Sequence, residues 1–98
     1  MDIKKELIGS SAMVRIDGRI DSVTSPELKS ALDDLPADIT DLTLDFKGVL
    51  YISSAGLRVL LTNHKKFMGS GSMKLINVSS DVMDVFEITG FNNVLNIG

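Results

Sequence analysis

The residues with the clearest chemical potential are two neighbouring serines, Ser53 and Ser54, at a predicted strand-to-helix junction. A serine nucleophile needs a general base within about 3 Å, and His64 is the only histidine in the chain. His64 follows Ser54 by ten residues on the same predicted helix, which separates them by roughly 15 Å at about 1.5 Å per residue. The stretch Ser53–Gly56 also lacks the first glycine of the nucleophile-elbow pattern. We therefore expect no hydrolase site at these serines.

Other constellations that support enzymatic chemistry are missing from the sequence. The glycine-containing loop Gly69–Ser72 follows a predicted helix and carries no lysine of the kind that a P-loop directs at phosphates. The chain has no cysteine and one histidine, which excludes thiolate metal sites and the usual multi-histidine centres. We therefore expect no metal, no cofactor and no enzymatic activity.

Net charge and hydropathy narrow the class of partner and the location. The net charge of -3 and the pI near 4.9 leave no basic patch for nucleic acid. The N-terminal residues lack the long apolar run of a signal peptide, and no stretch approaches the length of a membrane span. With 98 residues, 44% of them hydrophobic, we expect one domain over residues 1–98, in the cytoplasm and without direct contact with nucleic acid or membrane.

The serine pair lies between a strand and a helix. Leu42, Leu44 and Phe46 alternate with polar residues, which is the period of a strand with one wet face. Val49–Ile52 is then expected to carry the chain back into the core. A helical stripe follows, made of Leu57, Leu60, Leu61, His64, Phe67 and Met68. Ser53 or Ser54 is therefore an N-cap candidate, at the end of the helix where a phosphate is well tolerated.

Three further segments have the pattern of strands, and a fourth is a candidate. Ile3–Ile8 is a short edge strand with charged residues suited to an exposed edge. Ala12–Ile20 alternates between buried and polar positions, and Gly18 marks a bulge or bend within it. Met73–Val78 is apolar on both faces, which suits a strand inside the sheet. Phe91–Ile97 ends in a short apolar segment that is a candidate for a final edge strand.

Two further helices are predicted from capping residues and stripes. The first begins at Thr24, through a capping box with Glu27, or at Ser25, which precedes a proline. Its stripe is Leu28, Ala31, Leu32 and Leu35, and Pro36 ends it. The last begins at Ser79 or Ser80 and buries a stripe made of Val82, Val85, Phe86 and Thr89 before it ends at Gly90.

The resulting order is strand, strand, helix, strand, helix, strand, helix. Strand–helix–strand connections imply parallel neighbours with right-handed crossovers, whereas the first two strands form an antiparallel hairpin. We therefore predict an α/β fold with a mixed sheet of four to five strands and three or more helices mainly on one face.

The string YISSAGL at the strand-to-helix turn resembles the phosphorylation motif of the STAS family, the bacterial anti-sigma factor antagonists. In that motif a small residue, a glycine and an aliphatic residue follow the phosphorylated serine, which matches Ser54 and the three residues after it. Ser53 stands where many antagonists have aspartate, so Ser53 is the alternative acceptor. The segment Gly18–Leu32 is similar to the family's strand–loop–helix element, and Thr89-Gly90 is similar to its closing helix exit.

The resemblance implies a switch without enzymatic activity. The unmodified protein would bind an anti-sigma factor that is also an ATP-dependent serine kinase, and phosphorylation of Ser54 would end that binding. A metal-dependent serine phosphatase would then reset the switch. The partner-binding residues implied by the resemblance are Asp21, Ser22, Ser53, Ser54, Gly56, Leu57 and Arg58. Arg58 lies one turn after Ser54, where it can pair with the phosphate or with the partner.

Two other classes of function stay open at this point. The domain can be a STAS scaffold or a small-ligand sensor that is not regulated by phosphorylation, or a minor enzyme, which the missing general base argues against.

Overall fold

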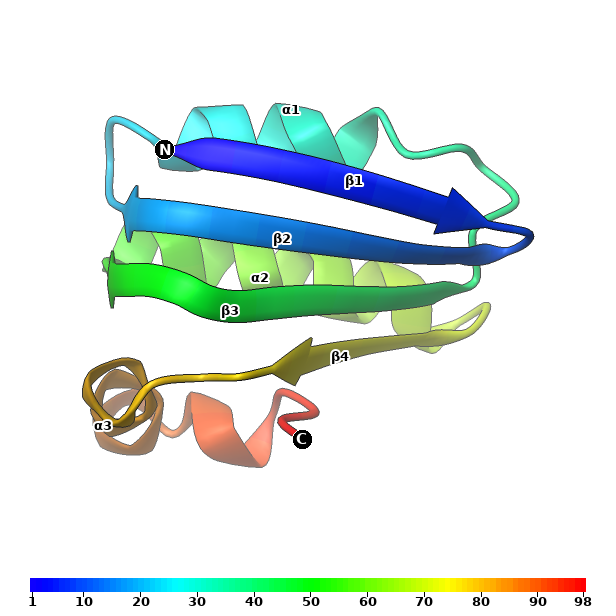
Figure 1. The fold of residues 1–98 in the computed structure, drawn as a ribbon. Helices are drawn as coiled ribbons and strands as arrows, with labels where there is room; N and C mark the ends of the chain where they lie inside the picture. Colours follow the sequence, from blue (N-terminus) through cyan, green and yellow to red (C-terminus); the bar gives the residue numbers. More distant parts are fainter.

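The computed structural model describes residues 1–98, which form one mixed sheet with helices on one face and beyond one edge (Figure 1). The elements are β1 (Asp2–Ile8), β2 (Ser11–Ile20), α1 (Ser25–Asp33), β3 (Asp41–Ile52), α2 (Ser54–Met68), β4 (Ser72–Ile76), α3 (Ser80–Thr89) and the short 3-10 helix η1 (Phe91–Asn93). The predicted order of strands and helices is confirmed.

The sheet has the strand order β1-β2-β3-β4. β1 and β2 form the predicted antiparallel hairpin, and β3 runs parallel to both β2 and β4. The prediction that Met73–Val78 lies inside the sheet is wrong, because β4 is an edge strand. On its outer side an isolated bridge joins Leu75 to Ile97, in which Leu75 bonds the carbonyl of Asn96 and the amide of Gly98. The predicted final strand is reduced to that bridge, since the preceding residues form η1.

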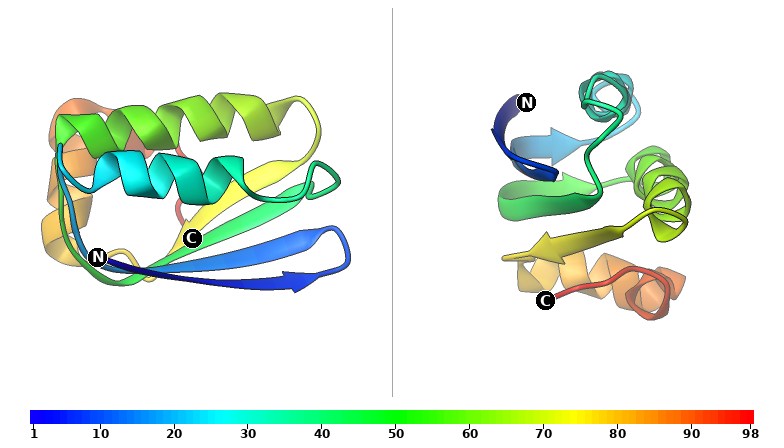
Figure 2. Two further views of the ribbon diagram at one scale, coloured as in Figure 1. Left: turned by 90° about the horizontal axis from the view of Figure 1, so that it is seen from above. Right: turned by 90° about the vertical axis from the view of Figure 1, so that its right-hand side faces the viewer.

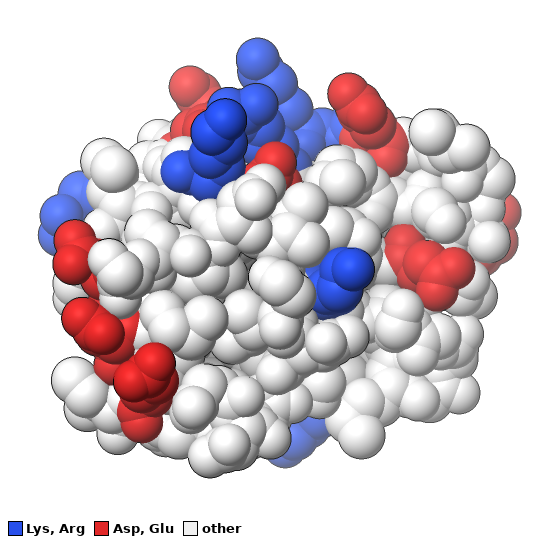
Figure 3. All heavy atoms as spheres, turned by 60° about the horizontal axis from the view of Figure 1, so that its bottom comes forward, with Lys and Arg blue, Asp and Glu red and all other residues white.

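Two helices cover one face of the sheet. Figure 2 (left) shows α1 and α2 side by side above the strands, while α3 lies at the end of the sheet beyond β4. The opposite face carries no helix and exposes charged side chains such as Arg15 and Asp17. The Nε atom of Arg15 lies 3.6 Å from Oδ2 of Asp17. In Figure 3, acidic side chains gather at the left, over α3, while Lys and Arg side chains cluster at the top of the view.

The core lies between the sheet and the helices. Val14, Ile16, Leu44 and Phe46 from the central strands are completely buried. Phe86 of α3 is also completely buried, and its ring centroid lies 6.4 Å from that of Phe46. These contacts fasten α3 to the end of the sheet.

Three helix predictions need correction. α1 ends at Asp33, before Pro36. Leu35 is still buried, but it belongs to the loop after the helix and not to the helix itself. Met68 is 67% exposed, because the buried face of α2 is centred on Leu60 and Asn63. Thr89 is exposed at the end of α3, where its hydroxyl donates to the carbonyl of Val85. By contrast, Gly90 ends α3 as predicted, with φ of 81°.

Candidate functional site

The candidate site lies where the parallel strands β2 and β3 end, at the left of Figure 1. Ile20 and Ile52 are register partners at the last position of the two strands. The next amide, that of Ser53, donates to the carbonyl of Ile20 across 2.8 Å. The loop that begins at Asp21 and the serine pair therefore leave the sheet side by side. This is the edge at which ligand and partner sites of open α/β sheets are commonly built.

The two serines occupy different structural positions. Ser53 has extended backbone angles and is the N-cap of α2, and its hydroxyl accepts from the amide of Gly56 across 3.5 Å. Ser54 is the first residue of the helix and is exposed, and no protein group bonds its hydroxyl. The cap is therefore Ser53, which settles the choice that the sequence left open. The free hydroxyl is that of Ser54.

Gly56 lets the start of α2 lie close to the sheet. A Cβ at this position would approach Ile20 Cγ2 to 2.6 Å and Ile52 Cγ1 to 2.8 Å. The next residue, Leu57, is 5% exposed. Both Gly56 and Leu57 were implied as partner-binding residues. Both residues are buried in this structure, and Gly56 brings the start of α2 close to the sheet; their role in partner binding stays a prediction.

Asp21 organises the loop after β2. One of its carboxylate oxygens accepts from the amides of Val23 (2.9 Å) and Thr24 (3.0 Å) and from the hydroxyl of Thr24. The amide of Thr24, helped by the other two donors, holds the pKa of the Asp21 carboxyl below its usual value. Ser22 stands exposed between these residues. Asp21 thus stays ionised and shapes the loop that flanks the serines.

The predicted capping box between Thr24 and Glu27 does not form. The hydroxyl of Thr24 donates to the carbonyl of Arg19 across 2.7 Å and accepts from the amide of Asp21. Thr24 is the N-cap residue of α1, without a side-chain cap bond. The Thr24 side chain therefore stabilises the loop between β2 and α1, and it does not bond the amides of the first helical turn.

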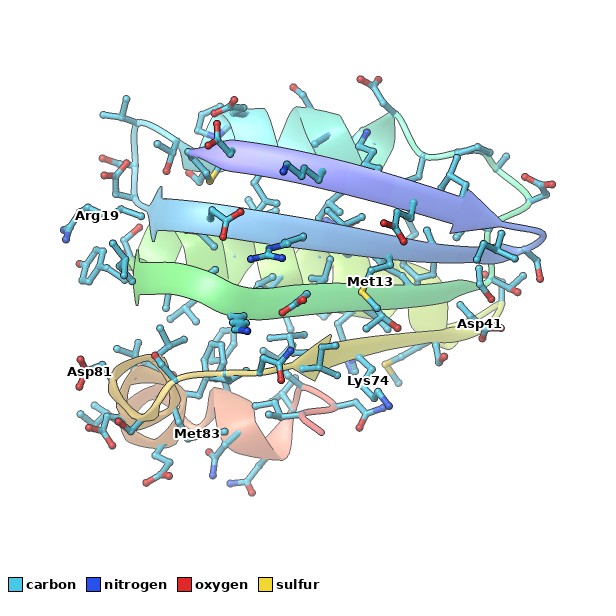
Figure 4. All side chains as sticks on the ribbon, viewed as in Figure 1. Met13, Arg19, Asp41, Lys74, Asp81 and Met83 are labelled. Carbon is cyan, nitrogen blue, oxygen red and sulfur yellow. The ribbon has the colours of Figure 1, made fainter.

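A β-bulge adds an apolar surface that the sequence prediction missed. The register between β2 and β3 shifts between Gly18 and Arg19, and Leu50 is left without a partner opposite it. Leu50 and Tyr51, which were expected to return to the core, are 71% and 39% exposed. Arg19, labelled in Figure 4, lies 4.4 Å from the centroid of the Tyr51 ring. Gly18, with φ of 112°, was the signal for this bulge.

Arg58 lies on the exposed side of α2, one turn after Ser54, and forms no ion pair. Its position allows contact with a group bound near the serine or with the neighbouring helix α1. His64 lies further along α2 and is half-buried, as expected. No group of three or more metal-binding side chains is present, and no helix is long and apolar enough to cross a membrane.

Residues 2–98 match the family model of the STAS domain. The chain therefore belongs to the STAS domain family. It is 33% identical over 98 residues to a protein of Bacillus subtilis named anti-sigma-B factor antagonist, across 99% of this chain and 88% of that relative. A protein with the same name from Staphylococcus aureus is 28% identical over 86 residues, across 86% of this chain and 80% of that relative.

Solved structures share the fold. An anti-sigma factor antagonist from Mycobacterium paratuberculosis superposes with a TM-score of 0.87 at 23% identity, across 98% of this chain and 83% of that one. The unphosphorylated form of the anti-sigma factor antagonist SpoIIAA gives 0.80 at 16% identity, across 99% and 88%. The phosphorylated form of SpoIIAA from Bacillus gives 0.75 at the same identity, across 99% and 91%.

Proposed function

We propose that this chain is an anti-sigma factor antagonist whose binding to its partner ends when Ser54 is phosphorylated. The observation that carries the proposal is the state of the Ser54 hydroxyl. It is exposed, free of protein hydrogen bonds and at the N-terminus of a 15-residue helix. The two relatives named anti-sigma-B factor antagonist support the class of function. The two recorded forms of SpoIIAA support a phosphorylated state for a protein of this fold.

The proposed partner is an anti-sigma factor that is also an ATP-dependent serine kinase. The kinase transfers the γ-phosphoryl group of ATP to the oxygen of Ser54, which releases ADP and the hydroxyl proton. A metal-dependent serine phosphatase hydrolyses the phosphoester with water and restores the hydroxyl. The chain itself supplies only the acceptor and the binding surface, and we propose that it works in the cytoplasm.

Electrostatics explains why this position suits a switch. A phosphate adds about -1.5 to -2 charges at neutral pH. At the start of α2, free backbone amides and the helix dipole stabilise that charge, so the fold tolerates it. The ionised Asp21 lies on the neighbouring loop, so the same phosphate makes this edge much more negative. A partner surface that accepts the unmodified edge is then repelled, because like charges at an interface are costly.

The surface available for the unmodified partner extends beyond the serines. Ser22, Ser54 and Arg58 are exposed there, and the bulge adds Leu50 and Tyr51 next to them. Apolar and aromatic side chains of this kind commonly anchor protein interfaces. We propose that they contribute contact area while Ser54 controls the charge.

The experiment compares three variants with the wild type. Each protein is incubated with the kinase partner and ATP, and the added mass is located by mass spectrometry of peptides. We expect phosphate on Ser54 in the wild type and in Ser53→Ala, and none in Ser54→Ala. Ser54→Asp should fold normally and bind the partner more weakly than the wild type.

Two outcomes would change the proposal. Phosphate that persists in Ser54→Ala and disappears in Ser53→Ala would move the acceptor to Ser53. Phosphate on neither serine of the wild type, in a reaction where the kinase phosphorylates a known substrate, would favour a STAS scaffold or ligand sensor that is not regulated by phosphorylation.

A further inference from the structure

An open groove of about 330 Å³ lies between α1 and α2. The two helices run side by side over the sheet (Figure 2), and the groove begins at Ala55, next to the candidate switch serine. Its volume falls at the lower end of the range of about 300–1,000 Å³ that is common for small-molecule sites. The groove is therefore large enough for a compact organic molecule.

The floor of the groove holds the two buried polar residues of the chain. Ser25 is 5% exposed and Asn63 is 3% exposed, and both line the groove. The side-chain NH2 of Asn63 donates to the carbonyl of Val59 across 3.0 Å. The hydroxyl of Ser25 and the side-chain oxygen of Asn63 have no protein partner, and neither is sealed from the groove. Both oxygens can therefore form hydrogen bonds with a polar group that enters the groove.

The walls carry one positive charge in excess. Lys29 of α1 pairs with Asp33 across 2.7 Å, and both side chains of that pair are about half exposed. Arg58 of α2 also lines the groove and forms no ion pair. Two cations and one carboxylate leave a single positive charge, which matches a monoanion better than a dianion. A guanidinium also presents paired donors that fit the two oxygens of a carboxylate.

We propose that this groove binds a small organic monocarboxylate that also carries a hydrogen-bond donor. The carboxylate lies against Arg58, the donor group reaches the side-chain oxygen of Asn63, and a short alkyl segment packs on Ala55 and Val59. The proposal does not depend on phosphorylation, so it can hold or fail independently of the switch at Ser54.

The test uses the purified, isotope-labelled full chain and nuclear magnetic resonance titration with sodium 3-hydroxybutyrate. This probe has a carboxylate, one hydroxyl and a short alkyl chain. The matched control is 1,3-butanediol, which replaces the carboxylate with an uncharged alcohol. We expect saturable amide shifts on the facing turns of α1 and α2, with an affinity in the millimolar range for so small a molecule. The diol should bind at least about tenfold more weakly, because it lacks the charge-assisted contact.

Two variants locate the site. Arg58→Gln should weaken binding of 3-hydroxybutyrate at least about tenfold, whereas Lys65→Gln, an exposed cation on α2 outside the groove, should leave binding unchanged. Shifts that grow linearly without saturation, or equal affinity in Arg58→Gln and the wild type, would overturn the proposal. Inorganic phosphate that binds as tightly as the probe would identify a general oxyanion site and overturn the monocarboxylate assignment.

Discussion

The different positions of the two serines predict opposite effects on stability and on phosphorylation. Ser53→Ala removes the hydroxyl that caps α2, and loss of a serine cap commonly costs about 0.5–2 kcal/mol. The bond to the Gly56 amide is 3.5 Å long, beyond the usual range, so we expect the lower part, about 0.5–1 kcal/mol. Ser54→Ala removes no hydrogen bond and places a better helix former in the first turn. We therefore expect its stability to be unchanged or raised by up to about 0.5 kcal/mol.

Thermal unfolding followed by circular dichroism measures both changes. For a domain of this size, the Ser53→Ala loss corresponds to a fall in Tm of roughly 2–8 °C, while Ser54→Ala should match or exceed the wild type. Phosphate transfer should show the reverse dependence, kept in Ser53→Ala and abolished in Ser54→Ala. If Ser54→Ala proved the less stable variant, the assignment of the cap and of the free hydroxyl would be refuted.

Three further predictions concern the core, the helix start and the loop. Phe86→Ala should lower the free energy of unfolding by roughly 3–5 kcal/mol in urea denaturation. The control Ile88→Ala, at an 86% exposed position of the same helix, should change it by less than about 0.5 kcal/mol. Equal midpoints for the two variants would place Phe86 outside the core. Gly56→Ala should destabilise by about 1–3 kcal/mol through overpacking against Ile20, measured by the same assay, and an unchanged midpoint would show that α2 can move away from the sheet. The pKa of Asp21 is lowered in the folded protein, so the ionised carboxylate stabilises the fold. This contribution to the free energy of unfolding is fully present above the unfolded pKa of about 3.9, and it is lost as the pH falls through the folded pKa. Asp21→Asn should therefore show a smaller loss of stability between neutral pH and acid, and an identical pH profile would contradict the role of Asp21 in the loop.

The architecture was accessible from the sequence because its periodicities are strong. Leu42, Leu44 and Phe46 alternate cleanly, and all three are buried in β3. Capping residues located the helix starts well, since Ser53 and Ser79 each accept from an amide of the first turn. Local chemistry of this kind depends on few neighbours, so a single sequence reveals it.

The features that the sequence did not reveal depend on contacts between distant segments. The exposure of Leu50 follows from a register shift between β2 and β3, and an apolar residue near a strand end is otherwise expected to be buried. Asn63 is buried because it lies on the same packed face of α2 as Leu60 and Phe67, although asparagine is usually an exposed residue. The groove likewise exists only through the pairing of two helices that the chain separates by β3.

The most direct test of the switch is the affinity of the kinase partner for two preparations of the same chain. One is unmodified, and the other is fully phosphorylated at Ser54, as verified by mass spectrometry. Isothermal titration calorimetry in the presence of ADP should give an affinity at least about thirtyfold weaker for the phosphorylated chain, since a buried like-charge contact costs about 2 kcal/mol or more. Thermal unfolding of the two preparations should at the same time agree within a few degrees. Equal affinity for the two preparations would contradict the proposal that phosphorylation of Ser54 ends partner binding.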